Sequence, residues 1–206
     1  MATRGPYAKG EAKRAEVVDV ALELFSRKGY DRTSFREVAR LAGLSQSGLL
    51  HHFRTKEELF VEVLRRRDEL NERFYDETVE HDVTIDGLTE IIKHNSVEPG
   101  LVRLYVSMSA ESTDATSPAR QFFVDRYQTL RADIAADIRR KQATGDLPDS
   151  LDPLTVASLV IAAADGLQLQ WLLDPDQVDM GAMLEQLTVL LRGGGSPRPA
   201  ENAVEA

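Results

Sequence analysis

Apolar residues recur along most of the chain at intervals of three and four positions, which is the spacing of an amphipathic α-helix. Glycine and proline interrupt this pattern where helices are expected to end or begin. The pattern therefore predicts an all-α protein of about nine helices. The expected spans are about 11–28, two short helices within 33–53, then 55–80, 84–95, 100–112, 118–144, 153–173 and 180–192.

Two short helices near the N-terminus have the spacing of a helix-turn-helix. Thr33 and Ser45 are suitable N-caps for them, and Gly43 tolerates the positive φ of the turn that joins them. Leu49 and Phe53 lie four residues apart, so they share one face of the second helix and can pack back onto the first. An ordinary helical hairpin with a glycine turn is the alternative.

The start of the second short helix should face outward if Leu49 faces inward. Its first residues are Gln46, Ser47 and Gly48. Such residues of a recognition helix reach base edges in the major groove. Glutamine can bond adenine at two points, serine can serve a base or a phosphate, and glycine permits close approach. A solvated helix surface is the alternative for Gln46 and Ser47 taken singly.

The fourth expected helix opens with a capping-box pattern, Thr55 followed by Glu58 three residues later. A helix N-terminus is a natural anion site, so its backbone N–H groups and Lys56 could clamp a DNA phosphate beside the recognition helix. The helix is long enough to connect one domain to another. We expect it to be the lever between them.

Charge is distributed unevenly along the chain, whose formal net charge is −9. Residues 1–67 hold 14 Lys and Arg against 9 Asp and Glu, whereas the remaining residues hold 11 against 25. A basic N-terminal part on an acidic body is expected when only one end meets phosphate. The basic arm with Arg4 and Lys9 could also touch DNA, with a frayed terminus as the alternative.

Several classes of chemistry find no support in the sequence. The chain has no cysteine, which excludes disulfides, thiolate zinc sites and a cysteine nucleophile. It shows no Gly-rich phosphate loop and no pair of histidines at i, i+4, so we expect no enzyme, metal site or cofactor. It shows no apolar run of transmembrane length and no signal sequence at its start, so we expect a soluble, cytoplasmic protein without a membrane partner.

The N-terminal pattern resembles that of the tetracycline-repressor (TetR) family of bacterial transcription regulators. The resemblance covers about residues 11–67 in one register. It rests on Ala21 to Phe25, Gly29-Tyr30, Thr33 to Glu37 with Val38-Ala39, Ala42 to Ser45, Leu49, His51 to Phe53, and Lys56 to Leu59. It implies a helical N-terminal domain that binds DNA and a larger helical domain that binds a small molecule and forms the homodimer. We expect these domains at 11–55 and 56–192, between flexible tails at 1–10 and 193–206.

The resemblance also implies DNA contacts by position. It implies phosphate contacts from Thr33, His51, His52 and Lys56, and base reading around Gln46 to Gly48. The family usually has a tyrosine where this chain has Leu50, so a hydroxyl contact is missing and the histidines are expected to do more of the positioning. Adjacent histidines project about 100° apart on a helix, so one of them could instead be a packing residue. The full expected set is Thr33, Ser34, Ser45, Gln46, Ser47, Gly48, Leu50, His51, His52 and Lys56.

The last two helices predict a dimer interface. From 156 to 173 the chain is apolar almost all round, so a single buried face cannot account for it. The ninth helix supplies a matching stripe, and pairing both helices with their symmetry mates gives a four-helix interface, as in the family. A two-fold dimer implies a roughly palindromic operator. The expected interface residues are Val156, Val160, Leu167, Met183, Leu184, Leu187 and Leu191.

The C-terminal part resembles the betaine-choline repressor type through Asp165 to Leu167, Leu169 to Leu173 and Asp174-Pro175. This resemblance does not name the ligand. Polar side chains on otherwise apolar helices are the pocket candidates, each with ordinary surface, interface or satisfied core as the alternative. They are His94, Arg103, Ser107, Tyr127 and Gln168, with Trp171 as an aromatic wall. Arg103 and Ser107, one turn apart, could hold an anion, unless Arg103 forms a salt bridge.

These features together favour a ligand-responsive, homodimeric repressor that binds double-stranded DNA at a palindrome and is released by a small molecule. Two alternatives stay open. A helical interaction protein that has lost sequence-specific DNA binding is suggested by Leu50. A transcriptional activator could be built on the same scaffold.

Overall fold

The computed structural model describes residues 6–78 and 84–193, which form nine helices and no strand. The all-α prediction is confirmed, and most boundaries lie within two residues of those expected. The helices are α1 Pro6–Lys28, α2 Phe35–Leu41, α3 Gln46–His52, α4 Lys56–Thr78, α5 Ile85–Asn95, α6 Pro99–Glu111, α7 Arg120–Ala143, α8 Pro153–Leu173 and α9 Met180–Gly193.

The chain ends and one internal break were expected to be irregular. Residues 6–10 are instead the first part of α1, so the expected N-terminal tail was too long. Gly193 likewise belongs to α9. Residues 1–5 and 194–206, the expected end of the fourth helix near residue 80 and the polar break at 81–83 lie outside the described residues.

Side chains at the helix starts define the turns as the sequence suggests, with one correction. Ser34, rather than Thr33, is the N-cap of α2, and its hydroxyl accepts the N–H of Glu37 at 3.1 Å. Gly43 has φ +67°, in the left-handed region that favours glycine, and this allows the sharp turn into α3. At α4 the Thr55 hydroxyl accepts the N–H of Glu58 at 3.0 Å, which completes the predicted cap.

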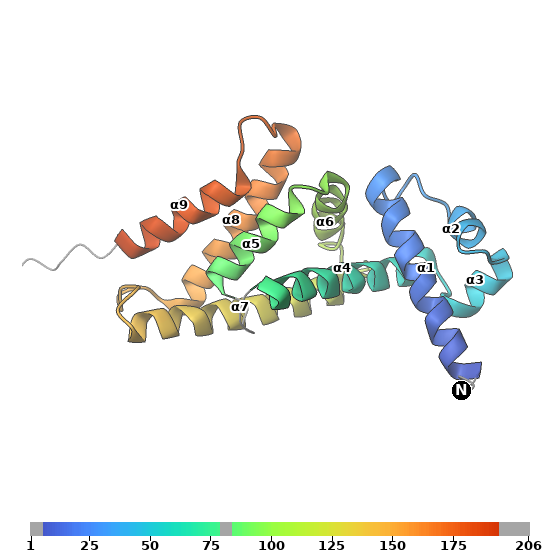
Figure 1. The fold of residues 1–206 in the computed structure, drawn as a ribbon, viewed down its shortest axis with the longest axis horizontal. Coiled ribbons are helices and arrows are strands. Elements are labelled where there is room, and N and C mark those ends of the chain that lie inside the picture. Colours follow the sequence, from blue (N-terminus) through green and yellow to red (C-terminus); the bar gives the residue numbers. More distant parts are fainter. Residues whose placement is uncertain (1–5, 79–83, 194–206) are drawn as a thin grey trace, which may run out of the picture.

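The N-terminal unit consists of α1, α2, α3 and the first half of α4, gathered at one end of the molecule (Figure 1). Its centre is apolar, and Phe25, Leu49, Phe53 and Phe60 are completely buried there. Burying one such side chain contributes about 1.5–3 kcal/mol, so burial of Leu49 and Phe53 supplies much of the free energy that holds α3 in place. The inward positions predicted for Leu49 and Phe53 are confirmed.

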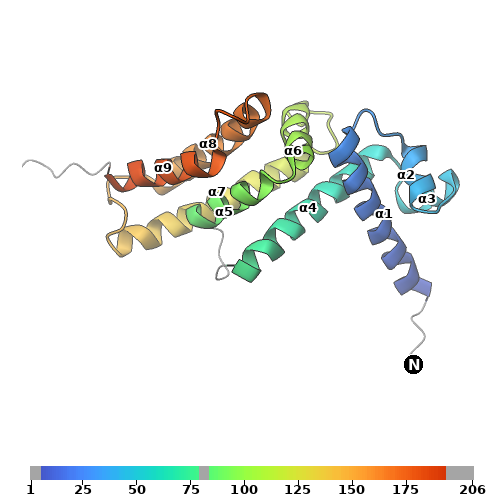
Figure 2. The same ribbon diagram turned by 45° about the horizontal axis from the view of Figure 1, so that its top comes forward.

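The body consists of α5 to α9 and the second half of α4. Its long helices α7 and α8 pack together, and α9 covers α5 and α8. Figure 2 shows α4 running from the N-terminal unit towards the body, beside α5 and α7. The first core continues from α1 and α4 into α6 and the start of α7 through Leu104, Tyr105, Met108 and Phe123. The two parts are therefore joined by shared packing as well as by the chain.

α8 corrects one expectation. By length and composition alone, Pro153–Leu173 is long and apolar enough to cross a membrane, whereas no such run was expected. The helix packs against α6, α7 and α9 and contributes Val160, Ile161 and Ala164 to the body core. A core helix of a soluble protein passes the same test when it is mostly buried, but only 33% of the apolar window of α8 is buried. Packing inside the protomer therefore accounts for part of its composition and leaves apolar side chains on its outer face.

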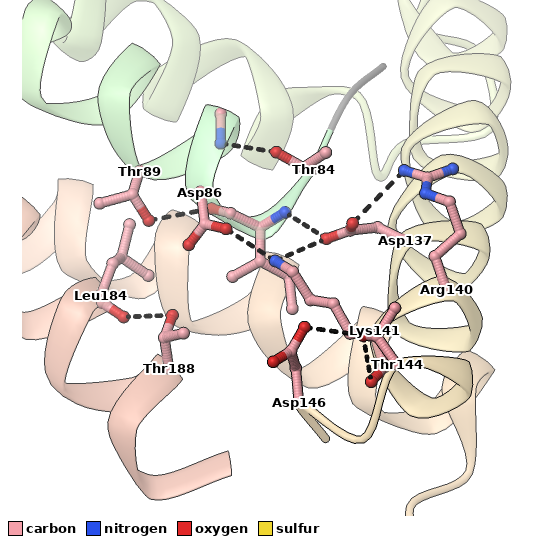
Figure 3. A network of polar contacts seen from close by, with 12 residues as sticks. Thr84, Asp86, Thr89, Asp137, Arg140, Lys141, Thr144, Asp146, Leu184 and Thr188 are labelled. Atoms are coloured by element: carbon pink, nitrogen blue, oxygen red, sulfur yellow. Dashed lines mark hydrogen bonds and ion pairs between the residues drawn. The ribbon is translucent and has the colours of Figure 1, made fainter. Parts of the chain in front are cut away.

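A buried carboxylate attaches the start of α5 to α7 (Figure 3). Asp137 of α7 accepts the backbone N–H of Ile85 at 3.1 Å and forms ion pairs with Arg140 at 3.3 Å and Lys141 at 3.0 Å. Lys141 also reaches Asp86 at 2.7 Å. An acid at a helix N-terminus completes the N–H groups that the helix leaves free. The network fixes α5 where the chain re-enters the described body after α4.

α6 meets α1 at a glycine. A Cβ built on Gly100 would lie 1.8 Å from the backbone oxygen of Ser26 and 2.6 Å from its carbonyl carbon. No side chain fits there, because real Cβ atoms are essentially never found under 3.0 Å from another heavy atom. Gly100 therefore permits the N-terminal turn of α6 to rest directly on the end of α1.

Candidate nucleic-acid interface

α3 is a short helix whose start is organised by side chains. Ser45 is its N-cap and accepts the N–H of Gly48 at 3.0 Å, as predicted. The hydroxyls of Ser45 and Ser47 are 3.0 Å apart, so both serines belong to this cap. A Cβ on Gly48 would lie 3.3 Å from the Ser45 hydroxyl. Gly48 therefore leaves room for the cap, in addition to the role in close approach to DNA expected for it.

The two faces of α3 differ in the way that a reading helix requires. Leu49 and the C-cap residue Phe53 are completely buried, whereas Gln46 and Ser47 are exposed. No described residue forms a hydrogen bond with the Gln46 side chain, so its amide is available to a base edge. Leu50 is 46% exposed, an apolar residue on the surface beside this face.

A cleft of about 660 Å³ runs between α2 and the start of α3. Ser34, Ser45 and Gln46 from the predicted set line it together with Arg36 and Arg40. The two arginines are exposed and have no ion pair among the described residues. Both were missed in the sequence, although they lie four residues apart on the face of α2 opposite buried Val38 and Ala39. Their position suits phosphate contacts beside the reading helix.

Thr33 belongs to the predicted DNA-contact set, but its surroundings in the structure argue against such a contact. Its side chain is 1% exposed, and its hydroxyl donates to the Gly29 carbonyl at 2.9 Å. Its backbone N–H already bonds the Tyr30 carbonyl at 3.2 Å. With both donors used inside the protein, Thr33 shapes the turn between α1 and α2 and has no donor left for a phosphate.

Lys56 lies at the N-terminus of α4 but is held by Tyr30. Its Nζ donates to the Tyr30 carbonyl at 2.6 Å and lies 3.9 Å from the centre of the Tyr30 ring. Burial is the main cause that lowers the pKa of Lys56, and Asp31 and Glu57 oppose it. An ammonium has three donors, so one phosphate contact is still compatible with this position.

The histidines at the end of α3 have different surroundings. His51 is exposed, whereas His52 is half-buried, and their rings meet edge-on with centroids 5.8 Å apart. Burial first, and then the charges of His51 and Arg14, lower the pKa of His52. Arg14 of α1 stacks 4.1 Å from the centre of the Phe53 ring. His51 is therefore the freer partner for a phosphate, and His52 belongs partly to the packing between α1 and α3.

The structure does not gather the predicted effector residues into one site. Arg103 and Ser107 line a cleft of about 500 Å³ between the end of α1 and α6. His94 lines a second cleft and Trp171 a third. Tyr127 lies inside the body, where it donates to Asp165 at 2.6 Å. Gln168 is buried, and its Oε1 has no partner among the described residues. The set therefore divides over several places.

The predicted interface residues divide in the same way. Val156, Val160 and Leu184 are buried inside the protomer core, so they offer no surface to a partner. Leu167, Leu187 and Leu191 are partly buried, and Met183 is exposed. The apolar side chains of α8 and α9 that do face outward are Leu154, Leu159, Leu169, Leu173, Met183, Val189 and Leu190.

Comparison with protein families divides the chain as the structure does. Residues 17–63 match the family described as "Bacterial regulatory proteins, tetR family". Residues 85–193 match "BetI-type transcriptional repressor, C-terminal", which covers more than half of the chain. The first match holds the second half of α1, α2, α3 and the start of α4, and the second holds α5 to α9.

Individual relatives extend over most of the chain. The HTH-type transcriptional regulator TtgR of Pseudomonas putida is 26% identical over 185 residues, or 84% of this chain and 86% of that protein. A regulator from Saccharomonospora viridis, solved in complex with choline, superposes with a TM-score of 0.75 at 22% identity over 91% of this chain and 100% of that one. FadR of Bacillus subtilis, solved with stearoyl-CoA, superposes with a TM-score of 0.67 at 18% identity over 88% of this chain and 99% of that one.

The likeness to the solved structures concerns the fold, whereas the matches to both family descriptions concern the sequence itself. The two family matches agree with the helix-turn-helix built on Ser45, Leu49 and Phe53 and with the helical body behind it. This chain belongs to the TetR family of transcriptional regulators, with a body of the BetI type.

Proposed function

We propose that this protein is a homodimeric repressor that reads a palindromic operator with α3 and leaves it when a small molecule binds the body. The observation that carries the proposal is the two-faced α3, with Leu49 and Phe53 buried and Gln46 exposed. Arg36 and Arg40 beside it supply positive charge without internal partners among the described residues. Phosphate contacts would position the helix, and Gln46 would read a base.

For the dimer interface, we propose the outward faces of α8 and α9 in place of the residues expected from the sequence. On α8, Leu159, Leu169 and Leu173 follow one another at helical spacing, with Ala162 and Gly166 between them. Leu159 is 60% exposed, and Leu190 on α9 is 62% exposed. A stripe of exposed leucines on two adjacent helices is unusual for a monomer and suits a two-fold four-helix contact.

A single charge tests this interface. Leu159→Glu places a carboxylate in the stripe and should convert the dimer to monomer in sedimentation measurements, because an unpaired charge would be buried. Leu154→Glu is the matched control, since Leu154 is also exposed on α8 but projects about 140° away from Leu159. If Leu159→Glu stays dimeric, or if both variants dissociate equally, this stripe is not the interface.

Selection of bound sequences from a random duplex pool at physiological salt tests DNA reading. We expect a palindromic consensus whose half-sites are separated by about one or more DNA turns. Exposed Leu50 favours the other reading, an interaction protein without sequence-specific DNA binding. In that case no sequence is enriched, and affinity for duplex DNA lacks the steep salt dependence that phosphate contacts produce.

Ligand release follows if the ligand prefers a protomer state in which the α4 helices hold the two reading helices at the wrong separation. A preference of about 1–3 kcal/mol changes operator affinity by about 5- to 150-fold. Choline and stearoyl-CoA occur with the same fold in other proteins, so the fold does not fix the ligand. A ligand that binds this protein and leaves operator affinity unchanged would contradict induction.

A further inference from the structure

Arg67 of α4 is a buried cation that is not paired with an acid among the described residues. The residue is 3% exposed, and its buried Nε has no hydrogen-bond partner among the described residues. Its guanidinium instead makes a cation–π contact with Tyr105, whose ring centre lies 4.8 Å from the guanidinium carbon. A buried charge that is neither paired nor hydrogen-bonded is costly, so such a group is expected to meet an anion in a functional state.

The acids nearest to Arg67 are already engaged. Asp68 accepts from Arg126, and Asp165 accepts the hydroxyl of Tyr127 at 2.6 Å. Arg126 also lies over the Tyr105 ring, at 5.4 Å, so a second cation adds repulsion. Burial, and then Arg126, lower the pKa of Arg67 to about 10, which leaves it charged at neutral pH.

Arg67 lines a cleft of about 270 Å³ where α1, α4 and the α5–α6 connection meet. Leu22, Leu70 and Leu101 form apolar parts of its wall, and Asn95 adds a polar one. Of the acids that also line it, Asp19 and Glu23 are paired with Arg66 and Arg27. Glu98 is left without such a pair among the described residues, and its charge repels any anion, a doubly charged one about twice as strongly as a single carboxylate.

We propose that this cleft binds a small organic acid, with its carboxylate on the Arg67 guanidinium and its apolar part against the leucines. A planar guanidinium matches a carboxylate with two parallel hydrogen bonds. The volume limits the ligand to one short chain or one ring. This inference rests on the proposed function in one respect: the cleft joins α1 of the N-terminal unit to α4 and α6, so the acid would be the effector.

Matched pairs of acids and amides test the charge requirement. Phenylacetate and hexanoate are titrated into the protein by calorimetry and compared with phenylacetamide and hexanamide. We expect each acid to bind at least tenfold more tightly than its amide. Equal binding of acid and amide, or no measurable binding of either acid, would overturn the proposal.

Variants of Arg67 locate the site. Arg67→Met should reduce acid affinity at least tenfold and raise the thermal midpoint of the free protein, because the unpaired buried charge is gone. Arg67→Lys keeps the charge without the planar fork, so it should retain a weaker preference for acid over amide. Arg65→Met is the control, since Arg65 is exposed and pairs with Glu62, and neither residue lines the cleft. If Arg67→Met binds acids as the wild type does, the site lies elsewhere.

Operator affinity separates this inference from the function on which it rests. If acids bind through Arg67 but do not change operator affinity, the site stands and its role as effector site is wrong. If the protein selects no operator at all, the proposed regulator fails, whereas the comparison of acids with amides still decides the site.

Discussion

The N-terminal unit and the body differ in what they bury. Among residues 8–64, Thr33 is the only polar residue in the buried class, whereas the body and α4 bury Arg67, Asn95, Asp137 and Gln168. Apolar packing holds one geometry and depends little on pH or solutes. Buried charges depend on their partners and make the surrounding structure sensitive to a change in any one of them. A rigid reading unit is thus joined to a body that can respond to chemistry.

The largest expected effect comes from opening the apolar unit. Phe53→Ala removes a completely buried ring at the end of α3. It should lower the free energy of unfolding by about 3–5 kcal/mol, because a cavity is left among α1, α3 and α4. Hydrogen exchange should then become fast in residues 8–64 and remain slow in 84–193, and operator binding should be lost.

Leu50→Ala is the control for this change, because Leu50 is exposed on the same helix. It should alter the free energy of unfolding by no more than about 0.5 kcal/mol. Equally fast exchange in the body of the Phe53→Ala protein would show that the two parts unfold as one cooperative unit. That result would contradict a separate apolar N-terminal unit.

The next effect concerns a buried charge of the body. Asp137→Asn keeps the shape but removes the carboxylate that bonds Ile85, Arg140 and Lys141. We expect a loss of about 2–3 kcal/mol in urea unfolding, since half-buried Lys141 then keeps the exposed Asp86 as its one acid partner among the described residues. Asp146→Asn, at an exposed acid beside the same network, is the control and should have little effect.

The pH dependence of this loss has a definite sign. Burial opposes protonation of Lys141, but its bonds to Asp86 and Asp137 raise its pKa above the ordinary 10.5. A raised lysine pKa stabilises the fold fully below pH 10.5 and less as the pH rises further. The difference between wild type and Asp137→Asn should therefore shrink above pH 10.5. A difference that stays constant there would assign the loss to the Ile85 cap instead.

Gly100→Ala tests the junction between the two parts. The new Cβ would collide with the backbone of Ser26, which cannot move aside as a flexible side chain could. We expect a loss of about 2 kcal/mol and a changed ligand response, with α3 itself untouched. Gly10→Ala has open space around it and should be neutral or stabilising by up to about 1 kcal/mol. Equal stability of the two variants would contradict the close approach.

The fold was largely predictable because its signals are local. Helical periodicity, the caps at Ser45 and Thr55 and the glycine at 43 depend only on neighbouring residues, and the structure confirms them. The choice of Thr33 over Ser34 as a cap failed because both are good cap residues. Which hydroxyl serves depends on the turn, where Thr33 bonds the Gly29 carbonyl.

The clefts were not predictable in the same way, because they depend on which helices meet. His94 and Arg67 are 27 residues apart and line one cleft, whereas Arg103 and Ser107 line another. A signal for Arg67 did exist, since it follows buried Phe60 and Leu64 at helical spacing and so places a cation on a buried face. The outward stripe on α8 was hidden for a related reason: a helix apolar all round does not show which face its own protomer covers.

The smallest expected effects separate base reading from phosphate contact within the rigid unit. Gln46→Ala should reduce discrimination at one base position of each half-site by about 1 kcal/mol, the low end for a two-point contact, because Gln46 lies in the solvent-exposed first turn of α3. Arg36→Ala should weaken binding to every sequence and make the salt slope less steep by about one unit per half-site. Both side chains are exposed and unpaired among the described residues, so neither change should alter unfolding. The consensus selected by each variant, with affinities at several salt concentrations, distinguishes the two roles. If Arg36→Ala changes the preferred base and Gln46→Ala does not, α2 rather than α3 reads the sequence.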